Sequence, residues 1–348
     1  MAGVHKKMKP TRRALVRSLL IICTLAAALA SVAACTATLT AAQTNATSQS
    51  AATPQTSSAQ EPRVFHVTVV DSTGNLVTGV RREDLNAFDG GEQREIVSFG
   101  AGDVPASVVF LIDTSSSAFG ENKGRNGARR ITALRDAVSA FMEGSNPSNE
   151  YFVTAFNKSP QILLEDSKDS RAVLAALDRL ASADLKGFTA MYDTLYLSLS
   201  KLAMRPTRKH VVVLITDGMD NTSRYTFADV RRALKESDVI LYPVGVFLEE
   251  ESQLNYTARA ILEELAASSS GRVFYPNDEA GMKAALTQMA SELREQYEVA
   301  FVPSARAKGD GWHEVRFKLG ELRDARGRKV KARVLARRGF YDESAPRR

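Results

Sequence analysis

Three short segments of the chain carry side chains that could hold a metal ion. Asp113, Ser115 and Ser117 lie together in one segment, and Thr189 and Asp217 lie in two later ones. Together they offer two carboxylates and three hydroxyls, which are hard oxygen donors, and they include no histidine or cysteine. This donor set predicts a site for Mg²⁺ or Mn²⁺ rather than zinc, with coordination positions left for water and one outside ligand.

The positions of these residues predict the sheet that brings them together. Asp113 directly follows the apolar run 107–112 (SVVFLI), and Asp217 comes shortly after the similar run 210–215 (HVVVLI). Continuous apolar runs of this length are typical of strands covered on both faces. Strand and helix patterns alternate after these runs, which indicates an α/β fold with a doubly wound, mainly parallel sheet. Ligands of such sheets bind outside the carboxyl ends of the strands, where both aspartates are expected.

The three segments together resemble the metal-ion-dependent adhesion site of the von Willebrand factor type A (VWA) domain. The family pattern is D-x-S-x-S, then a threonine in a G-x-T loop, then an aspartate in a D-G turn, and all three occur here in that order. The resemblance implies that Ser115, Ser117 and Thr189 bind the metal directly, whereas Asp113 and Asp217 act through waters and hydrogen bonds. It also implies a partner protein that offers an acidic side chain to the metal, and no enzymatic activity.

The segments on either side of the α/β region have β patterns. Residues 62–105 and 292–342 each contain too few short strands to be stable alone. We therefore predict that the two halves form one small β-sandwich-like domain, into which the VWA domain, residues 106–291, is inserted; residues 343–348 form a tail. The V-x-D-x-x-G-x-x-V-x-G pattern before the insertion and the closing R-x-G-F-Y resemble the VWA-related family that is abundant in acidobacteria.

Two alternatives to a metal-dependent adhesion protein remain open. Asp113 after the first strand and the pair Asp217 and Asp220 are weakly similar to the acidic motifs of haloacid-dehalogenase-like phosphatases. That chemistry needs a second carboxylate two residues after the nucleophile, and Ser115 stands there. The other alternative is a structural envelope protein whose metal site is not functional. The sequence contains no P-loop and no G-x-S-x-G nucleophile motif.

The N-terminal region predicts export. Residues 1–34 combine a basic stretch with a short apolar core, as a signal peptide does, and residues 35–61 form a linker rich in Ala, Thr, Ser and Gln. The sequence VAAC ending at Cys35 resembles a bacterial lipobox, so Cys35 is a candidate for lipidation. Ordinary cleavage with free secretion is the alternative, and adjacent Arg12 and Arg13 leave twin-arginine export open beside the general route. We expect an exported protein in the cell envelope or the periplasm, whose contact with the membrane is through the lipid anchor.

The charge of the chain gives no reason to expect nucleic acid binding. The formal net charge is +6, from 46 Lys and Arg against 40 Asp and Glu. Six of the basic residues and none of the acidic ones lie in the leader, residues 1–34, so the remaining 40 basic residues balance the 40 acidic ones. The positive charge therefore belongs to the leader and not to the folded part.

Overall fold

The computed structural model describes residues 61–119, 125–182, 188–247, 253–305, 311–323 and 326–342. These residues all belong to one compact unit. The predicted signal peptide, nearly all of the linker, Cys35 and the C-terminal tail lie outside the described residues. Among the described residues, no helix combines the length and the apolar character that a membrane crossing requires.

The α/β region is built on a five-stranded sheet with the strand order β7-β6-β5-β8-β9. The strands are β5 (Ala106–Asp113), β6 (Glu150–Phe156), β7 (Pro160–Ser167), β8 (Lys209–Thr216) and β9 (Val239–Gly245). β5, β6, β8 and β9 are parallel, and β7 runs antiparallel at one edge. Every residue of β5 and β9 is buried, as the apolar run VVFLI within β5 predicts for that strand. In the parallel register Ile112 lies beside Ile215, so β5 and β8 end at the same edge of the sheet.

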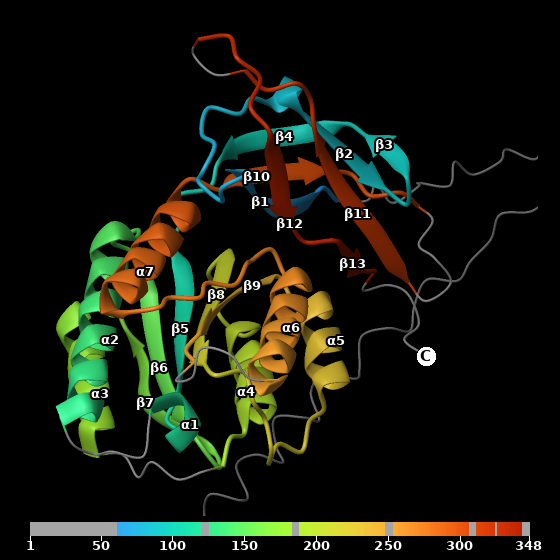
Figure 1. Ribbon diagram of the computed structural model, residues 1–348. Coiled ribbons are helices and arrows are strands. Elements are labelled where there is room, and N and C mark those ends of the chain that lie inside the picture. Colours follow the sequence, from blue (N-terminus) through green and yellow to red (C-terminus); the bar gives the residue numbers. More distant parts are fainter. Residues whose placement is uncertain are drawn as a thin grey trace, which may run out of the picture. The chain divides into compact units, whose positions relative to one another are not determined.

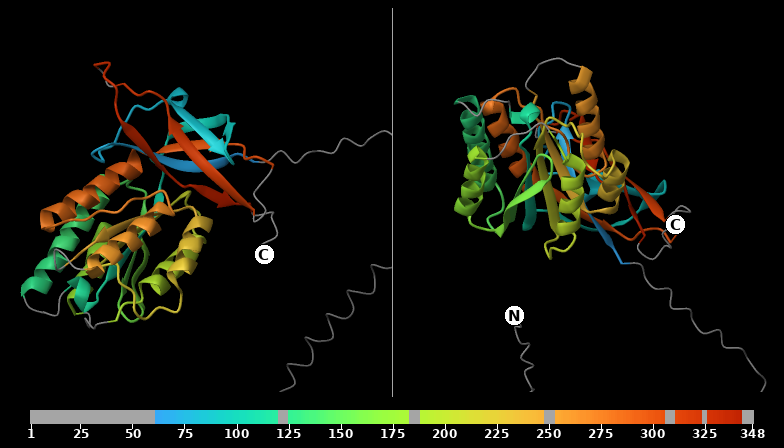
Figure 2. Two further views of the ribbon diagram at one scale, coloured as in Figure 1. Left: turned by 45° about the vertical axis from the view of Figure 1, so that its right-hand side comes forward. Right: turned by 90° about the horizontal axis from the view of Figure 1, so that it is seen from below.

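Helices cover both faces of this sheet (Figures 1 and 2). The helices are α1 (Ser116–Phe119), α2 (Arg125–Gly144), α3 (Ser170–Asp178), α4 (Met191–Leu202), α5 (Phe227–Glu236), α6 (Gln253–Ala267) and α7 (Glu279–Arg294). α2, α3 and α7 pack on one face and form a core around Phe110 and Phe141. α4, α5 and α6 pack on the other face around Leu111 and Leu214. Alternate residues of β5 thus enter opposite cores, and the predicted fold class is confirmed.

The two flanking segments form two four-stranded antiparallel sheets, ordered β12-β1-β10-β4 and β13-β11-β2-β3. Their strands are β1 (Arg63–Asp71), β2 (Leu85–Asp89), β3 (Glu92–Arg94), β4 (Ile96–Ala101), β10 (Tyr297–Phe301), β11 (Trp312–Leu319), β12 (Ala332–Ala336) and β13 (Gly339–Tyr341). Each sheet mixes strands from both segments, and Phe65 of β1 stacks on Phe301 of β10 with ring centroids 5.0 Å apart. The α/β region is therefore inserted in a β domain, as predicted.

One strand predicted from the sequence is absent. The sequence of residues 76–80 (LVTGV) predicts a strand, because it is rich in apolar and β-branched residues. Among the described residues, however, this segment makes only a one-residue bridge, between Val70 and Leu76. Gly79 has φ +74°, which lies outside the extended region that a strand requires. A short 3-10 helix, Arg82–Asp84, leads into β2 instead.

Lys209, the first residue of β8, joins the inserted region to the β domain. Its side chain is 1% exposed. The ammonium group donates hydrogen bonds to the carbonyl of Gly102, next to the end of β4, and to the carbonyl of Leu293 in the last turn of α7 at 2.7 Å. One buried lysine therefore makes hydrogen bonds to both segments that connect the β domain with the inserted region.

Candidate metal-ion site

The carboxylate of Asp113 is held at the end of β5 by neighbours from two strands. Its Oδ2 accepts a hydrogen bond from the Thr216 hydroxyl at 2.6 Å, and its Oδ1 accepts one from the backbone N–H of Ser115 at 2.9 Å. Asp113 and Ser115 are fully buried. Because Thr216 is the last residue of β8, its hydroxyl joins the carboxyl ends of the two central strands through the Asp113 side chain.

Asp217 follows Thr216 in a tight turn. Its Oδ1 accepts a hydrogen bond from the backbone N–H of Met219 at 3.0 Å, and only 6% of the residue is exposed. Gly218 makes the turn with φ +80°, and a Cβ there would lie 3.1 Å from side-chain atoms of Ala258 and Leu262 of α6. The glycine of the D-G pair is thus required both by its backbone conformation and by its close contact with α6.

The loop that carries Thr189 is tied to the loop that follows β8. The backbone N–H of Thr189 donates to the Asn221 side chain at 2.9 Å, and the N–H of Asn221 donates back to the Thr189 carbonyl at 3.1 Å. Asp220 accepts from the backbone N–H of Tyr192 at 2.9 Å, at the start of α4. Thr189 is therefore held by the same short loop that contains Asp217, and it is 2% exposed.

Some residues that hold the candidate site were not recognised from the sequence, and one residue has a different role from the one considered there. Thr216 and Asn221 were not among the candidate residues, although Thr216 directly precedes Asp217, Asn221 follows it four positions later, and both carry hydrogen-bonding side chains. Asp220, which favoured the phosphatase alternative, orients the start of α4 and the side chain of Ser223 instead. Ser117 lies in α1, and its side chain is outside the described part of the structure.

The electrostatics of the site favour a bound cation. Burial and the nearby charge of Asp217 raise the pKa of Asp113 to about 7, although hydrogen bonds from Thr216 and Ser115 oppose the rise. Within the described residues, neither aspartate makes an ion pair with a basic side chain. In the same residues no three His, Cys, Asp or Glu side chains lie close enough to bind one metal ion. Two carboxylates without a counter-charge, next to hydroxyl oxygens, fit a hard divalent cation that is also bound by water.

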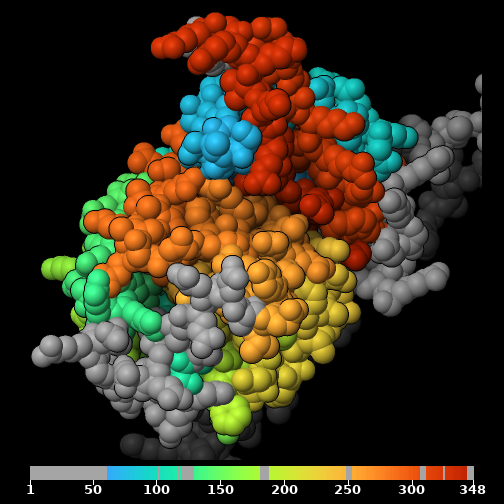
Figure 3. All heavy atoms as spheres, in the orientation of Figure 1, coloured from blue at the N-terminus to red at the C-terminus, as the bar shows by residue number. Residues whose placement is uncertain are grey.

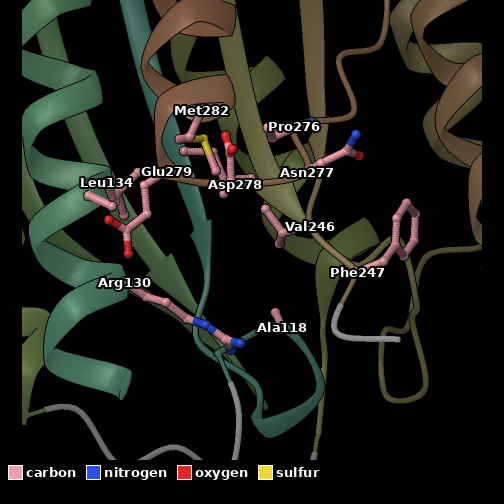
Figure 4. Close-up of a pocket in the computed structure, with 12 residues that line it drawn as sticks. Ala118, Arg130, Leu134, Val246, Phe247, Pro276, Asn277, Asp278, Glu279 and Met282 are labelled. Carbon is pink, nitrogen blue, oxygen red and sulfur yellow. The ribbon is translucent and has the colours of Figure 1, made fainter. Parts of the chain in front are cut away.

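A pocket of about 200 Å³ adjoins the site through Ala118 of α1 (Figure 4). Its walls come from α2, the end of β9 and the start of α7, and they include Leu134, Val246 and Met282. Arg130 extends from α2 toward Ala118 (Figure 4). The pocket contains none of the five candidate metal-site residues, so it is a neighbour of the site and not part of it.

The family of the protein follows from a comparison of its sequence with models of protein families. Residues 107–291 match the model of the von Willebrand factor type A domain. The chain belongs to the VWA family. The matched range begins in β5 and ends in α7, so it contains all five candidate residues of the VWA domain. Among curated proteins, no sequence matches this chain significantly.

Solved structures with related architecture are distant in sequence. The PilB minor pilin from Streptococcus sanguinis is 14% identical with a TM-score of 0.45, and the match covers 56% of this chain and 62% of PilB. This chain thus spans less than two thirds of that relative. A von Willebrand factor type A protein from Catenulispora acidiphila is 15% identical with a TM-score of 0.44, over 83% of this chain and 76% of that one. An aerotolerance-related membrane protein from Bacteroides fragilis is 17% identical with a TM-score of 0.42, over 54% and 98%.

Proposed function

We propose that this VWA protein binds a partner protein through a divalent cation at Asp113, Ser115, Ser117, Thr189 and Asp217. The observation that carries the proposal is the convergence of three segments at one edge of the sheet. Thr216 joins Asp113 to the end of β8 at 2.6 Å, and Asn221 joins the Thr189 loop to the loop of Asp217 at 2.9 Å.

The donor set supports Mg²⁺ or Mn²⁺ as the cation. Ser115, Ser117 and Thr189 are neutral ligands, and Asp113 and Asp217 supply negative charge behind them. A cation bound mainly by neutral oxygens keeps much of its positive charge, and it would attract a carboxylate from outside the protein. We therefore propose that the partner offers a Glu or Asp side chain to an open coordination position, and that the site binds rather than catalyses.

We also propose that the protein is exported and remains at the cell envelope. The predicted signal peptide and the lipobox-like sequence ending at Cys35 support this proposal. The uncharged segment 36–60, which would separate the folded domains from a lipid anchor, supports it as well. A metal-dependent binding site in a domain held at the membrane by such a linker would be accessible to partner proteins in the envelope.

Metal binding is tested by isothermal titration of Mg²⁺ and Mn²⁺ into the full chain and its variants. Asp113→Asn keeps the shape of the side chain and removes its charge, so we expect metal affinity to fall about 10- to 100-fold. Thr189→Ala should weaken binding while the melting temperature stays nearly unchanged. Asp136→Ala, at an exposed position on α2, is the matched control and should bind as the wild type does. Equal affinities for the wild type and Asp113→Asn would refute the assignment.

Partner capture is tested separately, by a pull-down from envelope extract with Mg²⁺ and with a chelator. We expect the chelator to abolish capture and to leave the melting temperature nearly unchanged. A chelator that lowers the melting temperature without changing capture would instead support the structural alternative, in which the metal only stabilises the fold.

A further inference from the structure

Two exposed side chains lie beside the candidate metal site, at the carboxyl edge of the sheet. Phe188 directly precedes Thr189 and is 53% exposed, whereas Thr189 is 2% exposed. Lys158 is exposed in the short turn between β6 and β7. Its Nζ lies 5.9 Å from the centre of the Phe188 ring. In Figure 3 the yellow-green surface at the lower end of the α/β region has the colour of the segment that begins α4.

Two backbone hydrogen bonds hold the turn between β6 and β7 against the site. The carbonyl of Asn157 accepts from the N–H of Ala190, directly before α4, at 2.6 Å. The carbonyl of Phe156 accepts from the N–H of Thr114, in the D-x-S-x-S segment, at 2.7 Å. The turn is therefore tied to two of the three segments that form the candidate site, and the basic side chain that it carries lies at the same edge of the sheet.

The exposure of Phe188 indicates an apolar contact with the partner. Removing an aromatic ring from water is favourable, and aromatic side chains carry much of the binding energy at protein interfaces. Phe188 is the chain neighbour of a candidate metal ligand, so a partner whose carboxylate binds the metal also comes within reach of the ring. An apolar side chain close to that carboxylate would cover Phe188.

The charge of Lys158 indicates a second acidic residue in the partner. Within the described residues, Lys158 makes no ion pair. Its contact with the Phe188 ring leaves the positive charge of the ammonium group in place. Arg224, in the loop after β8, differs from it because its guanidinium group is paired with Asp193 at 3.5 Å. Lys158 can therefore form an ion pair with a carboxylate of the partner.

The spacing of these groups indicates the spacing of the partner's side chains. On an extended chain, side chains two residues apart lie on the same face, about 7 Å from each other. The 5.9 Å between the Lys158 Nζ and the Phe188 ring is close to this spacing. We propose that the partner segment is extended and carries an acidic, an apolar and a second acidic residue at alternate positions. The first carboxylate binds the metal, the apolar side chain packs on Phe188, and the second carboxylate pairs with Lys158. This inference rests on the proposed function and names the class of partner sequence.

The proposal is tested by fluorescence anisotropy with three fluorescein-labelled peptides and the full chain in Mg²⁺. The first peptide is Gly-Glu-Gly-Leu-Gly-Glu-Gly, the second has Ser in place of Leu, and the third has Gln in place of the last Glu. The wild type should bind the first peptide saturably. We expect the second to bind about tenfold more weakly, through loss of the apolar contact. The third should bind about two- to fivefold more weakly, as is usual for an exposed ion pair.

Two variants assign these differences to single residues. In Phe188→Ser the affinities for the Leu and Ser peptides should become equal, and in Lys158→Gln those for the Glu and Gln peptides should become equal. Met204→Ser and Lys168→Gln are the matched controls. Both residues are exposed and follow the ends of α4 and β7 at the opposite edge of the sheet, so these variants should bind all three peptides as the wild type does.

Failure of this inference and failure of the proposed function give different results. Equal binding of the three peptides by the wild type, lost when a chelator is added, would overturn the inference and leave metal-dependent binding intact. The same holds if Mg²⁺ binds in the calorimetric titration but no peptide binds. Peptide binding that is unchanged by the chelator, or absence of Mg²⁺ binding, would overturn the proposed function and this inference with it.

Discussion

Replacing Lys209 by methionine should change how the stability of the protein depends on pH. Lys209 is 1% exposed, and burial lowers the pKa of its ammonium group from 10.5 to about 8, although the charges of Glu298 and Asp103 oppose the shift. The group nevertheless donates to the carbonyls of Gly102 and Leu293. Methionine keeps much of the length of the side chain and removes both the charge and the donors.

The expected magnitude follows from the lowered pKa. Below pH 8 the lysine is protonated in the folded and the unfolded protein, so its contribution does not vary with pH. Between pH 8 and pH 10.5 only the unfolded chain keeps the proton, and the free energy of unfolding therefore rises with pH. A pKa of about 8 instead of 10.5 corresponds to a rise of about 3 kcal/mol, since one pH unit is worth about 1.4 kcal/mol.

At pH 7 the variant has two opposing effects. It leaves two buried carbonyls without a donor, which costs about 1–3 kcal/mol for each. It also removes the burial of a charge, which is worth about 3 kcal/mol by the same pKa. At pH 7 the wild type should therefore be between about 1 kcal/mol less stable and about 3 kcal/mol more stable than the variant. As the pH approaches 10.5, the difference should shift by about 3 kcal/mol in favour of the wild type.

Urea unfolding from pH 7 to pH 10.5 measures this difference. Other groups that titrate in this range are common to both proteins, so they cancel when the variant's free energy of unfolding is subtracted from that of the wild type. Lys283→Met, at an exposed position on α7, is the control and should follow the wild type. A difference between wild type and Lys209→Met that stays constant across the range would refute the reasoning.

Two further predictions concern the fold and the leader. Gly271→Ala should destabilise the protein by about 3 kcal/mol or more, because a Cβ there would lie 1.9 Å from the carbonyl oxygen of Leu241. Gly100→Ala is the control and should be tolerated, since no atom lies within 4 Å of its new Cβ. Thermal unfolding compares the two variants, and equal melting temperatures would contradict the predicted clash. Mass spectrometry of the mature protein should find a lipidated Cys35 at the N-terminus, and an unmodified N-terminus at any other residue would exclude the anchor.

Much of the α/β fold could be predicted from the sequence because its determinants are local. The run 108–112 (VVFLI) is apolar at every position, as a strand buried on both faces must be, and Asp113 follows it without a gap. The run 211–215 (VVVLI) is likewise apolar, and Asp217 follows it after one residue, Thr216. Parallel strands that alternate with helices place all their carboxyl ends at one edge, so the type and spacing of these residues were enough to predict that their side chains would converge.

The contacts that hold the candidate site could not be predicted in this way, because they join residues far apart in the chain. The hydroxyl of Thr216 reaches Asp113 across 103 residues, and Asn221 reaches Thr189 across 32. A hydroxyl or an amide has many possible partners, and only the strand order decides which one it meets. The sequence therefore indicated the side chains of the candidate metal site but not the residues that orient them.

Burial and strand pairing in the β domain were likewise decided by the tertiary structure. Lys209 resembles any surface lysine at the start of a strand, and its burial arises only where the β domain and the inserted region meet. Composition indicated that neither β segment could form a core alone, but not that β12 would stand at the edge of its sheet. The sequence by itself determined which side chains could bind a metal and that two of them, Asp113 and Asp217, lie at or just after the ends of buried strands. The packing of distant segments decided which charges are buried and which residues hold the candidate site, because both depend on contacts between residues far apart in the chain.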